Sequence, residues 1–312
     1  MISYTLGFIL DLIIGEPHNP YHPVRGIGAF AKGLEKRFRD IFSRNLYLAG
    51  GVTWVLTIIA TYFISSFLLG QVYRFGFLVG AIVEGVVIYF CISSRGLAVE
   101  GMKVIKTLKN GDIEGARHKL SYIVGRDTST LDEKGIVRAV VETVSENMSD
   151  GIIAPMMFAA LGGAPLAMAY KAVNTCDSMF GYKNDKYREF GYVSAKMDDI
   201  ANFIPARVTA YFIVAAAYIL KYDYKGSLRI YKRDRYNHLS PNSAHPEAAV
   251  AGALGIRLGG VNYYFGKPVE KPTIGDDLRP ISVEDVDKTN RILMVVSLLG
   301  YFAGIIFIKI GG

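Results

Sequence analysis

Carboxylate and amide side chains gather in one stretch of the sequence, between Glu142 and Arg207. The stretch contains the segments ETVSENMSDGIIAP, GGAPLAMAYKAVNTCDSMFGYK and FGYVSAKMDDIANFIPAR. Its polar residues alternate with apolar runs that carry no ionisable side chain, and Gly and Pro interrupt these runs. A carboxylate beside an apolar layer is costly unless it is paired, hydrated or bound to a cation. The clustering therefore indicates a functional site rather than an ordinary surface.

The first acids of this stretch share one face of an expected helix. Charged residues recur every four positions, at Arg138, Glu142, Glu146 and Asp150. Apolar residues recur at the same interval, offset by two positions, at Ile136, Val140, Val144 and Met148. An offset of two residues is about 200° of helix rotation, so the stripes lie on opposite faces. A solvated helix face is the ordinary explanation. Because the acidic stripe ends with Asn147 and Asp150 where the chain becomes apolar, a functional role is favoured.

A second group of polar residues follows the first apolar run. Lys171, Asn174 and Asp177 are three residues apart, so they share a face if this segment is helical, and Gly181 could end that helix. Asp198 and Asn202 are four residues apart, with Asp199 beside them. A lysine, an amide and a carboxylate on one face could hold a phosphate and Mg²⁺, which takes few carboxylates together with phosphate oxygens.

Two proline-containing segments outside this stretch carry histidines. Gly15 to Gly28 has three prolines and three glycines, which predicts an irregular loop bearing His18, His22 and Arg25. A simple connector is the alternative. Zinc is not favoured, because the prolines break helical spacing and no Cys or HExxH pattern accompanies the histidines.

The second proline-containing segment, SPNSAHPEAAVAGALGIRLGG, places Asn242 in a loop and Glu247 in the first turn of an alanine-rich helix. A negative charge at a helix start suits the helix dipole, and this is the ordinary explanation for Glu247. The glycines from 255 to 260 do not form the GxxxxGK[ST] pattern, so no Walker motif is assigned.

The composition indicates a membrane protein with sizeable polar segments. Apolar residues make up 51% of the 312 residues, charged residues still make up 20%, and the mean hydropathy is positive. The net charge of +7 comes without a nucleic-acid recognition motif. Basic cytoplasmic loops explain it, with anionic substrates as a second contribution. The two cysteines imply no disulfide framework, and the N-terminus does not resemble a cleaved signal peptide.

The expected fold is all-α and polytopic, a single membrane-embedded domain over residues 1–312 with broken helices around the site. The predicted spans are 46–73, 75–94 and 292–308, and the apolar runs 151–170 and 203–220 are expected to be spanning or re-entrant. The predicted cytoplasmic-side segments are 15–45, 95–150 and 221–291. Residues 1–14 are short for a span. Glu84, an acid inside a predicted span, is expected to face the helix bundle with a hydrogen-bonding partner.

Positive-inside counting creates a conflict for the acidic stretch. If both 151–170 and 203–220 crossed the membrane, several site candidates would lie outside, away from cytosolic nucleotides: Asn174, Asp177, Asp198 and Asp199. We therefore expect the polar stretch between these runs to face the cytoplasm or a cavity open to it. Cysteine labelling at residues 183–186 exclusively from the outer face would contradict this.

Five segments resemble the motif blocks of the CbiB/CobD family of cobalamin biosynthesis, in the expected order. They are DLIIGEPHNPYHPVRGIG, ETVSENMSDGIIAP, YKAVNTCDSMFGYK, FGYVSAKMDDIANFIPAR and SPNSAHPEAAVAGALGIRLGG, and the resemblance covers most of Asp11 to Gly266. It implies an integral membrane adenosylcobinamide-phosphate synthase in the cell membrane, with its site facing the cytoplasm. Such an enzyme joins a carboxylate of adenosylcobyric acid to the amine of aminopropanol or its phosphate, using ATP and Mg²⁺.

With this chemistry, the acids become candidates for binding Mg²⁺ or deprotonating the amine. This catalytic set is Glu142, Glu146, Asp150, Asp177, Asp198 and Asp199, with Glu146, Asp177 and Asp198 as the predicted metal ligands. The candidates for holding phosphate or carboxylate groups are Arg25, Lys171 and Arg207, those for orienting substrates are His22, Asn147, Asn174 and Asn242, and Glu247 is a further substrate-binding candidate.

Two other functions fit parts of the pattern. A transporter for an anionic or corrinoid-like substrate could also use a broken apolar segment and intramembrane acids. A CDP-alcohol phosphotransferase would need a DGxxAR signature, which Asp150 and Gly151 do not continue. The state of the amine donor, phosphorylated or not, and self-association into a homo-oligomer stay open; no nucleic-acid partner is expected.

Overall fold

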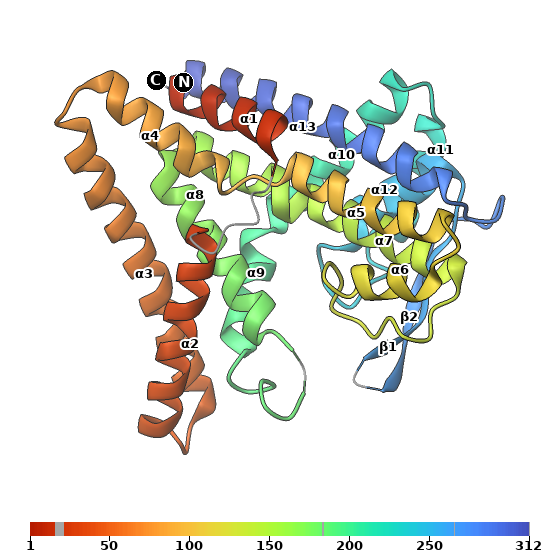
Figure 1. The fold of residues 1–312 in the computed structure, drawn as a ribbon, viewed down its shortest axis with the longest axis horizontal. Helices are drawn as coiled ribbons and strands as arrows, with labels where there is room; N and C mark the ends of the chain where they lie inside the picture. Colours follow the sequence, from red (N-terminus) through yellow and green to blue (C-terminus); the bar gives the residue numbers. More distant parts are fainter. Residues whose placement is uncertain (16–21, 183, 265, 312) are drawn as a thin grey trace. The chain divides into compact units, whose positions relative to one another are not determined.

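A computed structural model describes residues 1–15, 22–182, 184–264 and 266–311. It confirms the all-α polytopic membrane fold. Four helices among the described residues are long and apolar enough to cross a membrane, or five if one bent pair forms a single span. The chain divides into two compact units. Unit 1 contains Met1–Ser93, Ala154–Asn202 and Tyr301–Gly312, and unit 2 contains Ser94–Ile153 and Phe203–Gly300 (Figure 1).

Unit 1 is built around two long apolar helices, α3 and α8. Its helices are α1 (Ile2–Ile14), α2 (Pro23–Ile41), α3 (Leu46–Tyr73), α4 (Phe77–Tyr89), α8 (Ala154–Phe180), α9 (Tyr192–Ala201) and the end of α13 (Glu284–Gly311). α3 packs along α2, α4, α8 and α9. Only 17% of the most apolar 18-residue segment of α3 is buried within the protein, which is the exposure expected of a helix surrounded by lipid.

The predicted loop from Gly15 to Gly28 is partly wrong. Its second half is helical, because α2 begins at Pro23, where a proline lacks only an N–H that the first helical turn leaves unpaired anyway. His22 caps this helix through Nδ1, which accepts a hydrogen bond from the Val24 N–H at 3.3 Å. Arg25 therefore lies in the first turn of α2. His18 lies outside the described residues.

The prediction of a broken apolar segment is confirmed in α8. Gly162 and Gly163 leave helical geometry, and Gly163 has a φ of 66°, which a side chain would disfavour. The break exposes a backbone N–H that Glu84 of α4 satisfies. Glu84 accepts hydrogen bonds from the Ala164 N–H at 3.2 Å and from the Tyr73 hydroxyl at 2.6 Å. The expectation for Glu84 is confirmed, because this acid faces partners inside the bundle.

Unit 2 surrounds a fully buried small-residue helix. Its elements are α5 (Ser94–Lys109), α6 (Ile113–Leu120), α7 (Glu133–Asn147), the π-helical segment η1 (Met148–Ile153), α10 (Phe203–Ile219), α11 (Tyr224–Asp234), α12 (Ala244–Leu254), β1 (Leu258–Tyr264), β2 (Lys267–Ile274) and the first part of α13. Every residue of α12 is buried, and α12 contacts α7, α10, α11 and β2. Its alanines and Gly252 allow this, because small side chains let helix backbones approach closely.

A two-stranded hairpin in unit 2 was not expected from the sequence. β1 pairs antiparallel with β2, and the register shifts between Leu258 and Gly260. Gly259 and Gly260 both have positive φ, at 79° and 85°, which explains why glycines stand at the irregularity. The hairpin contributes the Gly259 N–H and the Lys271 side chain to the candidate site of unit 2.

Candidate functional site

Glu142 of α7 is locked into an ionic contact rather than exposed to solvent. Its carboxylate accepts a hydrogen bond from the Arg126 guanidinium and one from the Gly259 N–H at 2.8 Å, and Arg138 Nε lies 3.9 Å away. The side chains of Arg126 and Glu142 are 7% and 9% exposed. Arg126 also donates to the Asn262 side chain. Glu142 thus joins α7 to the hairpin, with its charge already balanced by arginine.

Glu146, one turn further along α7, has a different environment. Its carboxylate accepts a hydrogen bond from the Ser243 hydroxyl at 2.5 Å. It is partly exposed, and no cation lies within ion-pair distance of it in the part of the chain that the structure describes. Ser243 immediately precedes α12, so the contact joins α7 to the start of that helix. A charge held only by a hydroxyl can still attract a cation.

Glu247 lies in the first turn of α12, as predicted, but it is only 4% exposed. Burial raises the pKa of its carboxyl well above the ordinary value, and the charges of Glu142 and Glu146 raise it further. Lys271 and Arg126 act in the opposite direction. A role limited to the helix dipole does not explain an acid buried among two other acids.

Lys271 and His238 complete this cluster, and sequence reasoning missed both. Lys271 Nζ lies 3.3 Å from His238 Nε2, and His238 Nδ1 accepts a hydrogen bond from the Ser240 N–H at 3.0 Å. Burial disfavours the charge of Lys271, yet a hydrogen bond with Tyr264 and the charges of Glu247 and Glu146 raise its pKa. Burial lowers the pKa of His238. No motif surrounds Lys271 in the sequence, so no local signal could have found it.

Arg207 and Asn242, both predicted, are brought together near the start of α12. Arg207 Nη1 donates to Asn242 Oδ1 at 3.3 Å and to the Phe203 carbonyl at 2.6 Å, and the guanidinium carbon lies 3.4 Å from the Phe203 ring centre. Asn242 is 5% exposed. Because Ser243 contacts Glu146, the residues that precede α12 bring an arginine, an amide and an acid into one neighbourhood of unit 2.

His245 is a buried imidazole beside this arginine. Its Nδ1 lies 3.4 Å from the Tyr231 hydroxyl, and its Nε2 has no hydrogen-bond partner in the described part of the chain. Burial, then the charges of Arg207 and Arg235, lower its pKa to about 4. The ring is therefore neutral at pH 7 and presents an unsatisfied nitrogen.

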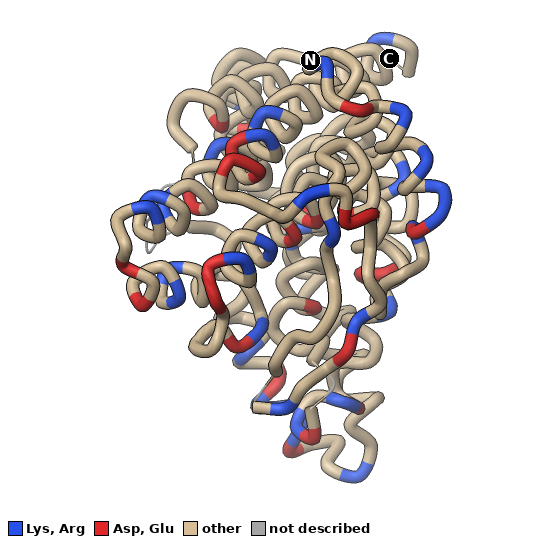
Figure 2. The backbone as a smooth tube through the Cα atoms, turned by 90° about the vertical axis from the view of Figure 1, so that its right-hand side faces the viewer, with Lys and Arg blue, Asp and Glu red and all other residues tan. Residues whose placement is uncertain are grey.

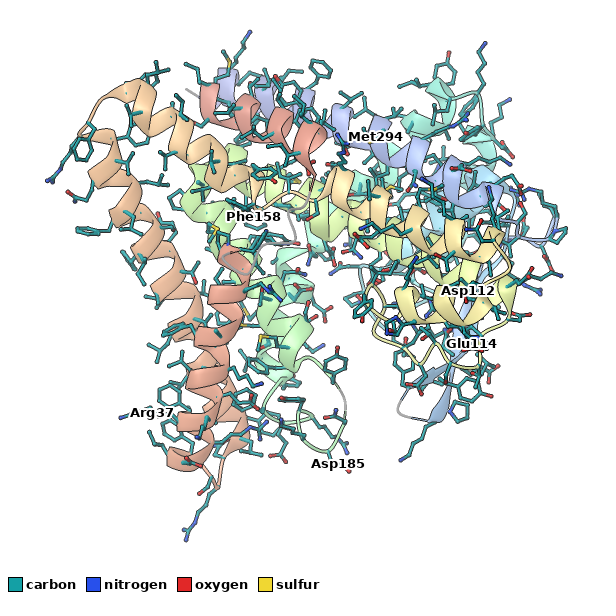
Figure 3. All side chains as sticks on the ribbon, viewed as in Figure 1. Arg37, Asp112, Glu114, Phe158, Asp185 and Met294 are labelled. Atoms are coloured by element: carbon teal, nitrogen blue, oxygen red, sulfur yellow. The ribbon has the colours of Figure 1, made fainter. Side chains whose placement is uncertain are left out.

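The remaining predicted residues of unit 2 lie at the end of α7. Asn147 donates to the Thr143 carbonyl at 2.9 Å, one turn back, which uses part of its amide for the helix itself. Asp150 is half-buried within η1. By contrast, Asp112, which precedes α6, and Glu114 in its first turn are exposed acids (Figure 3), and Asp112 caps the helix by accepting a hydrogen bond from the Gly115 N–H. Lys and Arg are spread over many segments of the chain (Figure 2).

In unit 1, α8 and α9 bring the predicted residues Asn174 and Asp198 together. Asp198 accepts hydrogen bonds from the amides of Asn174 at 3.4 Å and Asn202 at 3.0 Å. Tyr170 in turn donates to Asn202 at 2.8 Å. The predicted pairing of Asp198 with Asn202 is confirmed. Asp198 is 9% exposed, so this carboxylate is positioned by amide dipoles at the edge of a helix pair.

The other predicted residues of unit 1 are less closely grouped. Lys171 and Asp177 are half-buried on α8, which ends at Phe180, just before Gly181 as expected. Asp199 lies 3.8 Å from Lys196 on a more exposed side of α9. His22 caps α2, and Arg25 is exposed on it.

In each unit, one predicted acid accepts hydrogen bonds from neutral side chains. Among the described residues, no three His, Cys, Asp or Glu side chains are arranged to hold a metal by themselves. Mg²⁺ usually takes one or two carboxylates and completes its shell with waters and phosphate oxygens. Glu146, held by a hydroxyl, and Asp198, held by amides, are suited to this type of binding. Whether Glu146, Asp177 and Asp198 form one metal site stays a prediction.

The whole chain resembles known proteins of one family. The family model described as CobD/Cbib protein matches residues 4–293. A protein of Clostridium perfringens named cobalamin biosynthesis protein CobD is 61% identical, over 98% of this chain and 97% of the relative. A protein of Klebsiella pneumoniae with the same name is 48% identical, over 100% of this chain and 99% of the relative. Cobalamin biosynthesis protein CbiB of Salmonella typhimurium is 48% identical, over 96% of this chain and 94% of the relative. No solved structure matches the chain.

Proposed function

The chain belongs to the CobD/CbiB family of cobalamin biosynthesis proteins, and we propose that it catalyses ATP-dependent amide formation between adenosylcobyric acid and aminopropanol or aminopropanol phosphate. The observation that carries this proposal is the buried cluster of unit 2, in which three glutamates meet an arginine and a lysine next to Arg207 and Asn242. Ligation needs both charge types, because it handles a phosphate, a carboxylate and an amine.

The reaction takes two steps. In the first, a carboxylate oxygen of adenosylcobyric acid attacks the terminal phosphorus of ATP, which forms an acyl phosphate and releases ADP. In the second, the amine nitrogen attacks the carbonyl carbon, the C–N bond forms, inorganic phosphate leaves and the nitrogen loses a proton. Both steps develop negative charge on phosphoryl oxygens, which positioned cations stabilise.

We assign the phosphate-facing role to Arg207, which Asn242 and the Phe203 carbonyl orient by hydrogen bonds. Lys171 and Arg25 of unit 1 stay candidates for the same role. Glu146 of unit 2 and Asp198 of unit 1 are each proposed separately as a carboxylate ligand for Mg²⁺, which when bound supplies positive charge to the phosphate oxygens. Asp177 stays in the predicted metal set, and Asp150 and Asp199 stay candidates for the catalytic set.

Glu247 is assigned the proton-accepting role toward the amine. A raised pKa makes the ionised carboxylate a stronger base than an ordinary glutamate, because base strength rises with pKa, and the charges of Lys271 and Arg126 favour that ionised form. Its burial and the neighbouring acids supply that change. Lys271 and His238 lie in the same cluster and would keep its charge balanced as the proton moves. Glu142 is assigned a positioning role, because Arg126 already neutralises it.

Product formation by the purified protein tests the proposal. The protein in detergent is incubated with adenosylcobyric acid, ATP and Mg²⁺, and with each amine in a separate reaction, and the amide is detected by mass spectrometry. We expect amide and ADP in equal amounts, with one amine preferred. A folded protein that forms no amide with either amine would contradict the proposal and would favour transport. Amide formation without ATP would contradict the proposed use of ATP.

We also propose that the protein lies in the cell membrane with its site facing the cytoplasm. Single cysteines at residues 184–186, between α8 and α9, test this in intact cells and in inverted vesicles. Labelling from the cytoplasmic side supports the proposal, and labelling only from the outer side would contradict it.

A further inference from the structure

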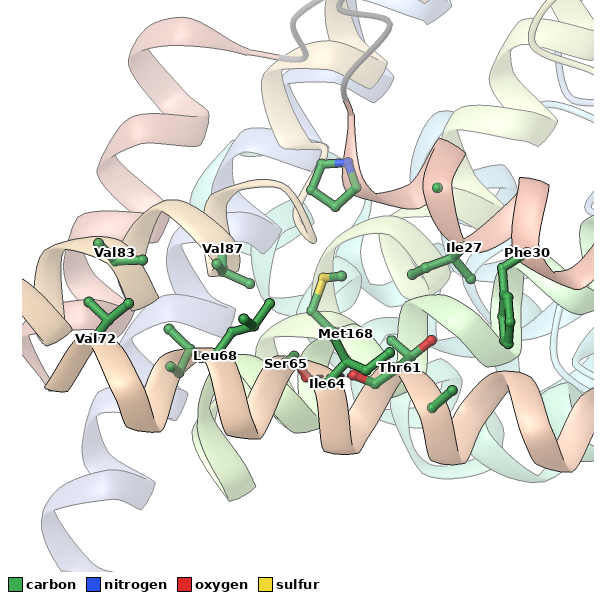
Figure 4. A pocket seen from close by; sticks show the side chains of 14 residues that line it. Ile27, Phe30, Thr61, Ile64, Ser65, Leu68, Val72, Val83, Val87 and Met168 are labelled. Atoms are coloured by element: carbon green, nitrogen blue, oxygen red, sulfur yellow. Dashed lines mark hydrogen bonds between the residues drawn. The ribbon is translucent and has the colours of Figure 1, made fainter. Parts of the chain in front are cut away.

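Unit 1 contains an apolar groove whose lining includes no residue assigned to ligation. Its volume is about 390 Å³, and α2, α3, α4 and α8 line it (Figure 4). α3 contributes a continuous stripe from Ala60 to Val72, and Met168 of α8 lies between the side chains of α2 and those of α4. Arg25, the predicted substrate-binding residue of α2, is not part of this lining.

The lining has no charged side chain and offers little hydrogen-bonding capacity. The Ser65 hydroxyl already donates to the Thr61 carbonyl at 2.7 Å. Three lining residues are also well exposed, at 45% for Phe30, 58% for Ile64 and 55% for Leu68. The groove is therefore continuous with the exposed apolar surface of α3. A polar substrate would lose its hydration here without compensation.

The dimensions of the groove match one leaflet of a bilayer. The stripe from Ala60 to Val72 covers twelve residue steps, or about 18 Å of helix. One leaflet contributes about 15 Å of hydrocarbon, half of a core about 30 Å thick. Arg74, exposed two residues beyond the stripe, is the only charged residue in the sequence from Leu46 to Val83. A lone arginine at the end of an apolar helix marks the level of the lipid headgroups.

We propose that this groove binds one acyl chain of an anionic phospholipid whose headgroup contacts Arg74. This site goes beyond the ligation chemistry and involves none of its residues. A hydrocarbon chain is one carbon wide and enters from the surrounding lipid without passing through water.

Gly26 provides a variant that fills the groove. It lines the groove, and a Cβ at this position would meet no atom within 4 Å, so Gly26→Phe projects a ring into open space. Gly33 is the matched control. It lies on the same helix two turns further on, a Cβ there also meets open space, and it does not line the groove.

The test uses a phosphatidylglycerol that carries a photoreactive diazirine in its acyl chain. The full-length protein is reconstituted with this lipid in nanodiscs, irradiated and mapped by peptide mass spectrometry. We expect wild type and Gly33→Phe to be labelled at Thr61, Ser65 and Met168 in excess of the outward-facing Phe63 and Phe67. Gly26→Phe should lower this groove labelling by about tenfold. Arg74→Gln should lower it for phosphatidylglycerol more than for phosphatidylcholine.

Three results would overturn the proposal. The first is equal labelling of groove and outward residues, which indicates bulk lipid only. The second is unchanged groove labelling in Gly26→Phe. The third is a crosslink between two protein copies through Leu68→Cys, which indicates that protein covers the groove. Each variant must also retain the wild-type elution volume and unfolding temperature. Failure of the ligation assay would leave this test unaffected.

Discussion

Two successive turns of α7 place the same side chain in two different environments. Glu142 is closed off by Arg126, by the Gly259 N–H and by the more distant Arg138, whereas Glu146 meets the Ser243 hydroxyl and remains partly exposed. An acid already balanced by arginine holds the hairpin to the helix. An acid held by a neutral group keeps its charge for a ligand. The partner rather than the residue type therefore separates a structural acid from a candidate catalytic one.

The largest expected effect follows from breaking the closed contact of Glu142. Arg126→Leu leaves a buried carboxylate without its main cation, which should cost about 3–5 kcal/mol of unfolding free energy. Denaturant unfolding of the purified protein in detergent measures this. Asp277→Asn is the control, because Asp277 and its partner Arg257 are both half-exposed and such pairs contribute about 0–1 kcal/mol. Equal costs for both variants would show that Glu142 is no more structural than a surface acid.

Glu146→Gln should act on turnover instead. Loss of one electrostatic contact in an active site lowers turnover by about 100-fold or more. The stability cost should stay near 1 kcal/mol, because the amide oxygen can still accept from Ser243. Glu133→Gln, an exposed acid on the same helix, is the control for both measurements. Near-wild-type turnover of Glu146→Gln would remove this residue from the metal set.

Acid should lower the stability of the folded protein through His245 of α12. Its pKa is about 4 in the folded protein and about 6.5 when unfolded, so the unfolded state binds the extra proton between these values. Stability is therefore complete above pH 6.5 and falls as the pH drops towards 4, by on the order of 2 kcal/mol. His245→Gln should show a smaller fall, measured as unfolding temperature against pH. Parallel curves for both proteins would contradict the assignment of a buried neutral ring.

The smallest effect is expected at Glu84, an acid of unit 1 with neutral partners and no proposed ligand. Tyr73→Phe removes one hydrogen bond to it and should cost about 1 kcal/mol of stability. Turnover should not change. A strong loss of turnover would contradict this and would indicate that Glu84, like Glu146, is a candidate catalytic acid with a neutral partner.

The sequence predicted the helices better than the partners of their polar residues. The spacing of Ile136, Val140, Val144 and Met148 predicted the buried face of α7, and all four side chains are 0% exposed. The same spacing could not show that Glu142 is buried as well. Its cation, Arg126, comes from a loop, and no local pattern links positions that tertiary packing alone brings together.

Prolines lie in two regular elements that were not predicted from the sequence. Pro23 contributed to the prediction of a loop, although a proline at a helix start is favourable. Pro268 and Pro272 lie within β2, in a stretch that was predicted only as part of the polar segment 221–291. A two-stranded sheet has only edge strands, which tolerate proline because the missing N–H can face outwards. With the hairpin overlooked, Lys271 could not be assigned to the cluster.

The glycine break in α8 has a consequence for how the family can vary. At Gly163, a Cβ would overlap the Glu84 carboxylate, and that carboxylate satisfies the Ala164 N–H which the break leaves unpaired. Neither position can change alone. A side chain at position 163 would displace the Glu84 carboxylate, and loss of that carboxylate would leave the buried Ala164 N–H without its hydrogen-bond acceptor. The two positions, remote in sequence, should therefore covary among homologues, with glycine and glutamate retained or replaced together.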